Sequence, residues 1–171
     1  NIYHPQRHTL AYSENMLGSP LPMAPVVWAT GNLVLALNVS ALLSVPICGA
    51  GAYLLSRRIG LAKRGALVAA LIFAFSPPRF FRLGQPHLTT IQWLPFCLAF
   101  LHTYFQTGFA RDLRWAIGFF ALQTITSGHG GVLTALAIVP LLIWQFALGE
   151  PLAPAKRLRD VGIPGILLLA L

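Results

Sequence analysis

The stretch that decides the fold runs from Asn32 to Leu55, NLVLALNVSALLSVPICGAGAYLL, and is followed closely by the basic pair Arg57 and Arg58. It is about 24 residues long, and at roughly 1.5 Å per residue a helix of that length crosses a hydrocarbon core of about 30 Å. Pro46 predicts a kink within it, and neighbouring helices can satisfy the carbonyl that the proline leaves free. We expect a transmembrane helix here.

The composition of the whole chain agrees with that interpretation. Hydrophobic residues make up 56% of the sequence and charged residues 9%, and the mean hydropathy is +0.70. Soluble domains carry about 25% charged residues, so an ordinary water-exposed surface is excluded. The net charge of +8 would suit nucleic acid, but the basic residues cluster at the ends of apolar segments, where they orient a membrane protein. We expect membrane lipid as a partner, and no nucleic acid.

Working outward from the first segment, further apolar stretches predict an all-α fold, a polytopic transmembrane bundle of about five to six spans. Pro77 and Pro78 are expected to end the second helix, because proline removes a donor and restricts the residue before it. The later helices are expected at about 59–76, 88–104, 113–126 and 131–148, with another starting near 162. Because the chain starts at Asn1 and stops in an apolar run at Leu171, we expect a bundle truncated at both ends.

The first 30 residues differ from the rest, and we expect residues 1–30 to be the end of an extracytoplasmic loop and residues 31–171 to be the bundle. The segment from Thr9 to Leu17 predicts a short helix lying along the membrane interface, with Gly18 at its C-terminal end. Pro20, Pro22 and Pro25 are expected to prevent that helix from continuing and to turn the chain into the first span.

The distribution of positive charge predicts which loops lie on which side. Nine of the twelve basic residues fall in the alternate segments 56–64, 107–114 and 149–160. The positive-inside rule therefore predicts that these three segments are cytoplasmic and that 77–88 and 127–131 are extracytoplasmic. Localisation is expected to be the cell inner membrane, with several passes.

Three basic residues remain on the outer side, and two of them suggest binding. Arg79 and Arg82 are three residues apart, so on a helix they share a face and could clamp one phosphate at two points. The alternative is simple contact with lipid head groups. His87 is flanked by Gln85 and Gln92, which suggests a substrate-binding group; the alternative, slightly favoured, is an interfacial histidine bonded to a carbonyl.

Glu14 is the one carboxylate on the expected outer side. It is either a solvated helix residue interacting with His8 or a functional group. With the nearby imidazoles it could form an acid/base or metal site, and we expect Glu14 and His87 to face a common outer cavity. His102, toward the cytoplasmic end of its segment, is expected to be bonded within its own helix.

The run FAFSPPRFFR at 73–82, followed by His87 and the QWLP of 92–95, resembles a pattern in large bacterial membrane proteins of the GT-C glycosyltransferase superfamily. The segments YSENMLG at 12–18 and GNLVLALN at 31–38 are similar to the same group. The resemblance implies a multi-span enzyme that uses a polyprenyl-phosphate sugar donor, with its active site on the extracytoplasmic side. It also implies a catalytic role for Glu14, although the family's usual second acidic residue is not seen here.

Some members of that superfamily use a divalent cation at the phosphate, so Mg²⁺ or Mn²⁺ held by Glu14 and His87 is a possible cofactor. Two other classes of function stay open. A secondary transporter or lipid flippase would use Arg79, Arg82 and His87 to guide an anionic substrate, but few polar residues lie mid-span and no repeat is visible. A non-catalytic membrane assembly subunit also fits a chain with one outer carboxylate. The sugar, the acceptor and the oligomeric state are left open.

Overall fold

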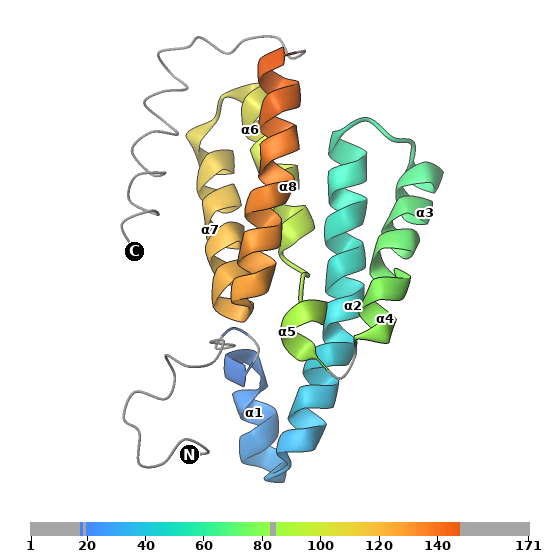
Figure 1. The fold of residues 1–171 in the computed structure, drawn as a ribbon, viewed down its shortest axis with the longest axis vertical. Coiled ribbons are helices and arrows are strands. Elements are labelled where there is room, and N and C mark those ends of the chain that lie inside the picture. Colours follow the sequence, from blue (N-terminus) through green and yellow to red (C-terminus); the bar gives the residue numbers. More distant parts are fainter. Residues whose placement is uncertain (1–17, 19, 83–84, 148–171) are drawn as a thin grey trace.

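The computed structural model describes residue 18, residues 20–82 and residues 85–147. Within these residues the chain forms eight helices and no strand, so the all-α expectation is confirmed. Figure 1 shows α6, α7 and α8 grouped on one side and α2 paired with α3 on the other. The helices are α1 (Pro20–Thr30), α2 (Leu33–Arg58), α3 (Lys63–Ala74), α4 (Pro77–Phe81), α5 (Pro86–Thr89), α6 (Leu94–Thr107), α7 (Ala110–Thr126) and α8 (Gly128–Ala147).

α2 is the helix that the opening stretch predicts, and its ends follow from local chemistry. Asn32 is the N-cap, and its side-chain oxygen accepts a hydrogen bond of 3.0 Å from the backbone N–H of Leu35. Arg57 and Arg58 occupy the last turn, where positive charge is favoured by the helix dipole. Pro46 lies inside the helix, as expected. With 26 residues, α2 is the longest helix among those described.

The segment before α2 corrects the expectation of a proline-rich turn, because residues 20–30 form α1. Pro20 is the first residue of this helix and Pro22 lies in the same turn, where backbone N–H groups have no helical partner in any case. Pro25 is carried inside the helix. Gly31 then adopts a left-handed φ of 65° and ends α1. The interfacial helix expected over Thr9–Leu17 lies outside the described residues.

The expected helix over 88–104 is in fact two helices, α5 and α6, separated by residues 90–93. Pro95 is the second residue of α6, where its missing N–H costs nothing. A side chain from α7 bonds two backbone groups of the break. Gln123 donates from Nε2 to the Thr90 carbonyl at 2.7 Å, and its Oε1 accepts from the Trp93 N–H at 3.0 Å. An interaction across 30 residues therefore satisfies the backbone that a continuous helix would have satisfied locally.

The remaining boundaries differ less from expectation. α3 starts at Lys63 rather than near residue 59, because Gly60 takes a φ of 101° and makes a separate turn after α2. α7 and α8 confirm the helices expected over 113–126 and 131–148, and each starts three residues early. The helix expected from Gly162 lies outside the described residues.

The distribution of polar and apolar side chains is reversed relative to a water-soluble protein. Among the described residues, the buried positions are as often polar or charged as apolar, and most of the apolar ones are Ala or Cys. Large aliphatic side chains such as Leu33, Ile72 and Ile143 are exposed. Small and polar interiors with apolar exteriors are typical of helices packed in lipid. The pattern indicates association with a membrane.

Two helices, α2 and the Gly128–Gln145 part of α8, are long and apolar enough to cross a membrane by length and composition. α3, α6 and α7 have 12, 14 and 17 residues, fewer than the roughly 20 that a full crossing needs. Among the described helices, two are therefore long and apolar enough to span a membrane, and the expectation of five to six spans stays a prediction.

The two ends of the bundle carry different loops. In Figure 1 the α2–α3 turn and the α6–α7 turn lie at the upper end, whereas the α7–α8 turn, α4 and α5 lie lower. Two of the three basic segments that were expected to share a side thus lie at one end. The third, 149–160, is outside the described residues. That the basic end faces the cytoplasm remains a prediction.

α2 is the helix shared by the two groups, since it packs against both α3 and α6. The two helices approach closely at Gly51, where an added Cβ would lie 2.7 Å from the Phe96 ring and 2.8 Å from Pro95. A side chain at this position would push α2 away from α6. Glycine is therefore required for the close approach of these two helices.

Candidate functional site

Arg79 lies in α4 and its side chain turns into the protein, where it is 5% exposed. Nη1 donates to the carbonyl of Ala74 at 3.2 Å, and Nη2 donates to the hydroxyl of Ser44 at 2.9 Å. Ser44 in turn donates to the Ala41 carbonyl at 2.7 Å. The guanidinium group thus joins the end of α3 to the middle of α2.

No carboxylate accompanies this buried charge within the described part of the chain. Asp112 is the one acidic residue there, and it is occupied elsewhere. Its Oδ2 accepts from the Thr107 hydroxyl at 3.3 Å, and its Oδ1 lies 4.0 Å from Arg111. Among the residues that the structure describes, the Arg79 guanidinium group therefore donates only to a hydroxyl and a carbonyl. Burying a charge without a counter-charge is costly, which is why such residues so often mark a site for an ion or a charged substrate.

An apolar groove lies along the contact between α2 and α3, and Arg79 is not one of its lining residues. It has a volume of about 570 Å³. Ala74 lines the groove and also accepts the hydrogen bond from Arg79, and Val45, next to Ser44, lines it on the other wall. The full lining comprises Val45, Pro46, Gly49, Ala50, Tyr53, Leu67, Ala70, Leu71, Ala74 and Phe75. The guanidinium group is therefore linked to the groove through its two hydrogen-bond partners, one of which lines it while the other adjoins a lining residue.

The depth of Arg79 differs from the interfacial position that the sequence suggested. Its partner Ser44 is 11 residues from the start of α2 at Leu33 and 14 from its end at Arg58. At about 1.5 Å per residue these separations are roughly 16 and 21 Å. Arg79 is therefore held near the middle of α2 and not at either end.

Arg82 has a different environment, and its guanidinium group shares no hydrogen-bond partner with that of Arg79. α4 ends at Phe81, so Arg82 lies just beyond the helix that was expected to place both on one face. Arg82 is exposed, and its Nη1 donates to Oε1 of Gln85 at 3.2 Å. Gln85 is exposed too. These two residues form a pair at the surface, separate from the buried contacts of Arg79.

Gln92 lies in the break between α5 and α6 and is buried, with its Oε1 lacking a hydrogen-bond partner among the described residues. A buried acceptor without a partner is costly, so Gln92 remains a candidate for contact with a ligand. His87 is a residue of α5, and its side chain lies outside what the structure describes.

Glu14 also lies outside the described residues, so its expected proximity to His87 stays a prediction. The nearest described residue, Gly18, donates its backbone N–H to the carbonyl of Ile125 at 3.0 Å, at the end of α7. Within the described residues, no three His, Cys, Asp or Glu residues gather in a way that could hold a metal ion. The Mg²⁺ or Mn²⁺ site at Glu14 and His87 likewise stays a prediction.

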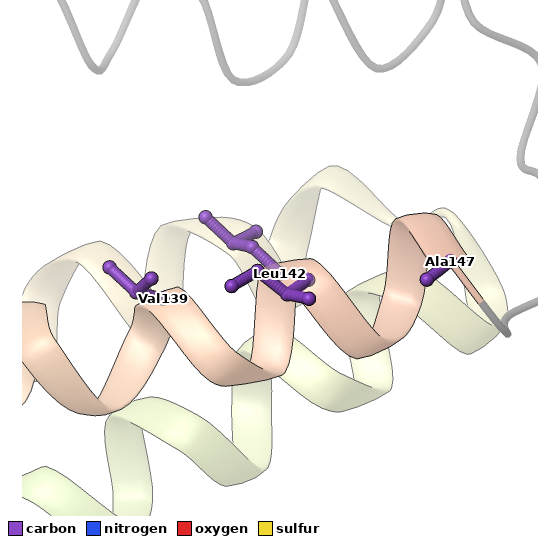
Figure 2. Close-up of a pocket in the computed structure, with 4 residues that line it drawn as sticks. Val139, Leu142 and Ala147 are labelled. Carbon is purple, nitrogen blue, oxygen red and sulfur yellow. The ribbon is translucent and has the colours of Figure 1, made fainter.

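A further hollow, of about 450 Å³, lies along α8 and is drawn in Figure 2. Its lining is Val139, Leu142, Ile143 and Ala147, all from this one helix. Aliphatic side chains offer no hydrogen bond that would orient a ligand. This hollow belongs to the apolar exterior and is not a candidate for chemistry.

Sequence reasoning missed two residues on which the site depends, Ser44 and Gln123. Ser44 shares a spacing of four with Cys48 and Ala52, and all three are buried on α2. Small residues at this spacing mark the face of a membrane helix that packs against its neighbours. That signal would have identified Ser44 as a residue facing the interior.

Comparison of the chain with protein-family models, with curated proteins and with solved structures found no match. The resemblance to the GT-C superfamily therefore stays a prediction that rests on the quoted sequence motifs.

Proposed function

We propose that this chain belongs to a multi-pass protein of the cell inner membrane, a GT-C-type glycosyltransferase that takes a sugar from a polyprenyl-phosphate donor on the extracytoplasmic face. The observation that carries the proposal is the buried guanidinium group of Arg79, whose hydrogen-bond partner Ala74 also lines an apolar groove. A lipid-linked donor has two unlike parts, a charged phosphate and a long isoprenoid chain. The arginine and the groove supply a partner for each.

The contacts of Arg79 favour phosphate recognition. Its planar group has five N–H donors, and the bonds to Ser44 and Ala74 use one from each terminal nitrogen. The remaining fork matches the geometry of phosphate oxygens. The Arg79 side chain is buried, so a charge-assisted bond is stronger there than at the surface. The isoprenoid chain would then follow the groove between α2 and α3 away from the phosphate.

The proposed reaction transfers the sugar to an acceptor hydroxyl and releases the lipid phosphate. Glu14 acts as the general base that takes the proton of this hydroxyl. Arg79 stabilises the negative charge that develops on the departing phosphate. A divalent cation, where bound, would be held by Glu14 and His87 and would neutralise part of the same charge. The remaining donor contacts are assigned to Arg82, Gln85 and Gln92.

A binding measurement on the whole protein in lipid nanodiscs tests this assignment, with a polyprenyl phosphate as the probe. Arg79→Gln should weaken binding by about tenfold or more, because a hydrogen bond to a charged group contributes roughly 1.5–3 kcal/mol. Arg79→Lys should restore binding only in part, since a point charge lacks the planar fork. Arg64→Gln is the control: it removes the same charge from an exposed side chain in the first turn of α3, to which no donor contact is assigned. Equal binding by the wild type and Arg79→Gln would overturn the assignment.

One observation favours a second candidate, a flippase for a lipid phosphate. Arg79 is held near the middle of α2, and charged residues at mid-depth are typical of proteins that move ions or head groups across the membrane. Two assays on the full protein separate the candidates. Release of labelled sugar onto an acceptor supports the transferase, whereas movement of a fluorescent lipid phosphate between leaflets of proteoliposomes without sugar transfer supports the flippase.

A further inference from the structure

A polar pocket of about 360 Å³ is lined by residues at the end of α2, in α6 and its C-terminal turn, and at the start of α7. These helix ends lie at the upper end of the bundle in Figure 1. The pocket has no part in the function proposed above, and it lies more than three helical turns along α2 from Ser44, the partner of Arg79. Its polar lining includes Arg58, His102, Thr103, Gln106, Arg111 and Asp112.

One of its two guanidinium groups is held rigidly. Arg58, in the last turn of α2, donates from Nη1 to the Thr103 hydroxyl at 2.9 Å and to the Ala99 carbonyl at 3.3 Å. Its guanidinium carbon also lies 4.1 Å from the centre of the Phe100 ring. Contacts with a hydroxyl, a carbonyl and an aromatic face fix the group in the wall of the pocket. Its other nitrogens have no partner among the described residues.

The second guanidinium group belongs to Arg111, whose side chain is 75% exposed. It lies 4.0 Å from Asp112, a buried carboxylate in the first turn of α7. Asp112 is favoured there by the positive end of the helix dipole and by its bond to Thr107. Two guanidinium groups against one carboxylate leave the pocket with an excess of positive charge, so it suits an anion.

His102 adds an independent sign that a ligand is expected. The residue lines the pocket, is 4% exposed and has no hydrogen-bond partner for Nδ1 among the described residues. The expectation that it bonds within its own helix is wrong. Its ring bonds to the backbone of Arg58 on α2, and it stacks on Trp144 of α8 at 6.3 Å between centroids. Since the bond to Arg58 uses the other nitrogen, Nδ1 is a buried acceptor that lacks a donor.

From this arrangement we infer that the pocket binds a phosphate ester that carries a hydroxyl group. Arg58 and Arg111 contact the phosphate, and the ligand hydroxyl donates to Nδ1 of His102. The glycerol phosphate head group of an anionic lipid has this chemistry, and so does a soluble glycerol phosphate. The inference does not rest on the role proposed for Arg79.

The test uses the full protein in detergent and two probes, a short-chain phosphatidylglycerol and glycerol 1-phosphate. Dissociation constants are measured by thermophoresis for the wild type, Arg111→Gln and Arg114→Gln. Arg111 is exposed, so its replacement should leave the fold intact, and Arg114 is an exposed arginine of the same helix that does not line the pocket. We expect Arg111→Gln to weaken binding by about tenfold, and Arg114→Gln to change it less than twofold, as a lost charge-assisted bond predicts.

The two probes identify the source of the ligand. Arg111-dependent binding of the lipid alone assigns the pocket to a membrane head group, and such binding of the soluble ester assigns it to a phosphate ester in solution. His102→Phe, which keeps the ring stack on Trp144 but removes Nδ1, should weaken binding of whichever probe is bound. Failure of both probes to bind, or equal weakening by Arg111→Gln and Arg114→Gln, overturns the inference, since the latter result would mean attraction to overall charge.

Discussion

Two arginines connect α2 to its neighbours, and they do so in opposite electrostatic settings. Arg58 leaves the last turn of α2 toward α6, remains partly exposed and shares its pocket with Asp112. Arg79 reaches α2 from α4, is buried and has no carboxylate near it among the described residues. Each makes two hydrogen bonds to neutral oxygen atoms. The difference therefore lies in the cost of burying the charge and not in the number of bonds.

That difference indicates what each residue is for. Arg58 keeps much of its hydration and gains a carboxylate neighbour, so its contacts should contribute to stability. Arg79 loses its hydration, a cost of several kcal/mol per ion that two bonds to neutral acceptors do not clearly offset. A residue that costs stability is expected where activity requires it. The predictions below test this contrast, beginning with the largest effect.

The loop that follows α4 and the end of α6 that meets Arg58 are predicted to lie on opposite faces of the membrane, and cysteine labelling gives an all-or-none test. Gln85 and Gln106 are exposed, near Arg82 and in the last turn of α6 respectively. A cysteine at 85 should react with an impermeant maleimide in intact cells, and one at 106 only after the membrane is opened. The native cysteines Cys48 and Cys97 are buried, so background labelling should be low. The reverse pattern would invert the orientation.

Gly51 lies between the two arginine contacts on α2, so a side chain there should disturb both. Gly51→Leu forces a side chain against Phe96 and Pro95 and should lower the free energy of unfolding by about 1–3 kcal/mol. Thermal unfolding in detergent measures the change. Gly118→Leu is the control, because no atom lies within 4 Å of a Cβ at that position. The same loss of stability in both variants would show that the close approach at Gly51 is unimportant.

Replacement of each arginine by methionine should separate their energetic roles. Arg58→Met removes the bonds to Thr103 and Ala99 and should lower the free energy of unfolding by about 1–2 kcal/mol. Arg79→Met removes a buried charge and should leave stability within about 1 kcal/mol of the wild type, or raise it. Chemical unfolding of both variants in the same detergent gives the comparison. A larger loss for Arg79→Met would mean that this arginine is mainly structural.

The smallest expected effect concerns the acceptor for Arg58. Thr103→Val keeps the shape of the side chain but removes the hydroxyl that accepts from Nη1 at 2.9 Å. Because the Ala99 carbonyl and the Phe100 ring remain, the loss should be about 0.5–1 kcal/mol. Thermal unfolding of Thr103→Val and Arg58→Met in the same detergent checks this. If both variants lose the same free energy of unfolding, the whole stabilisation comes from the Thr103 hydroxyl.

The sequence predicted those parts of the fold that depend on local pattern. Long apolar stretches gave α2, α7 and α8, with Asn32 and the two terminal arginines of α2 at the expected ends. Prediction from the sequence failed where the end of a helix depends on a residue far away in the chain. In the break after α5, Gln123, 30 residues from Trp93, bonds two backbone groups that a continuous helix would pair locally. α1 was missed for a local reason, since prolines in a first turn do not oppose a helix.

The candidate site was predicted in part, for a similar reason. Arg79 was identified because topology does not require a positive charge on that side. Its depth and its separation from Arg82 depend on which residue of α2 faces α4, and a single sequence does not reveal that pairing. Arg58 was overlooked for the opposite reason: the positive-inside rule accounted for its charge, so no feature of the sequence suggested a binding role.

The spacing of three contacts along α2 has a consequence for how the protein can move. Ser44, Gly51 and Arg58 are each seven residues apart, and seven residues fall only about 20° short of two full turns of a helix. They therefore form one nearly straight stripe that faces α4 and α6. A rotation of α2 by a single residue, about 100°, would break all three contacts together. These three contacts together oppose rotation of α2 about its axis. They do not oppose bending at Pro46, where the proline interrupts the helical hydrogen bonds.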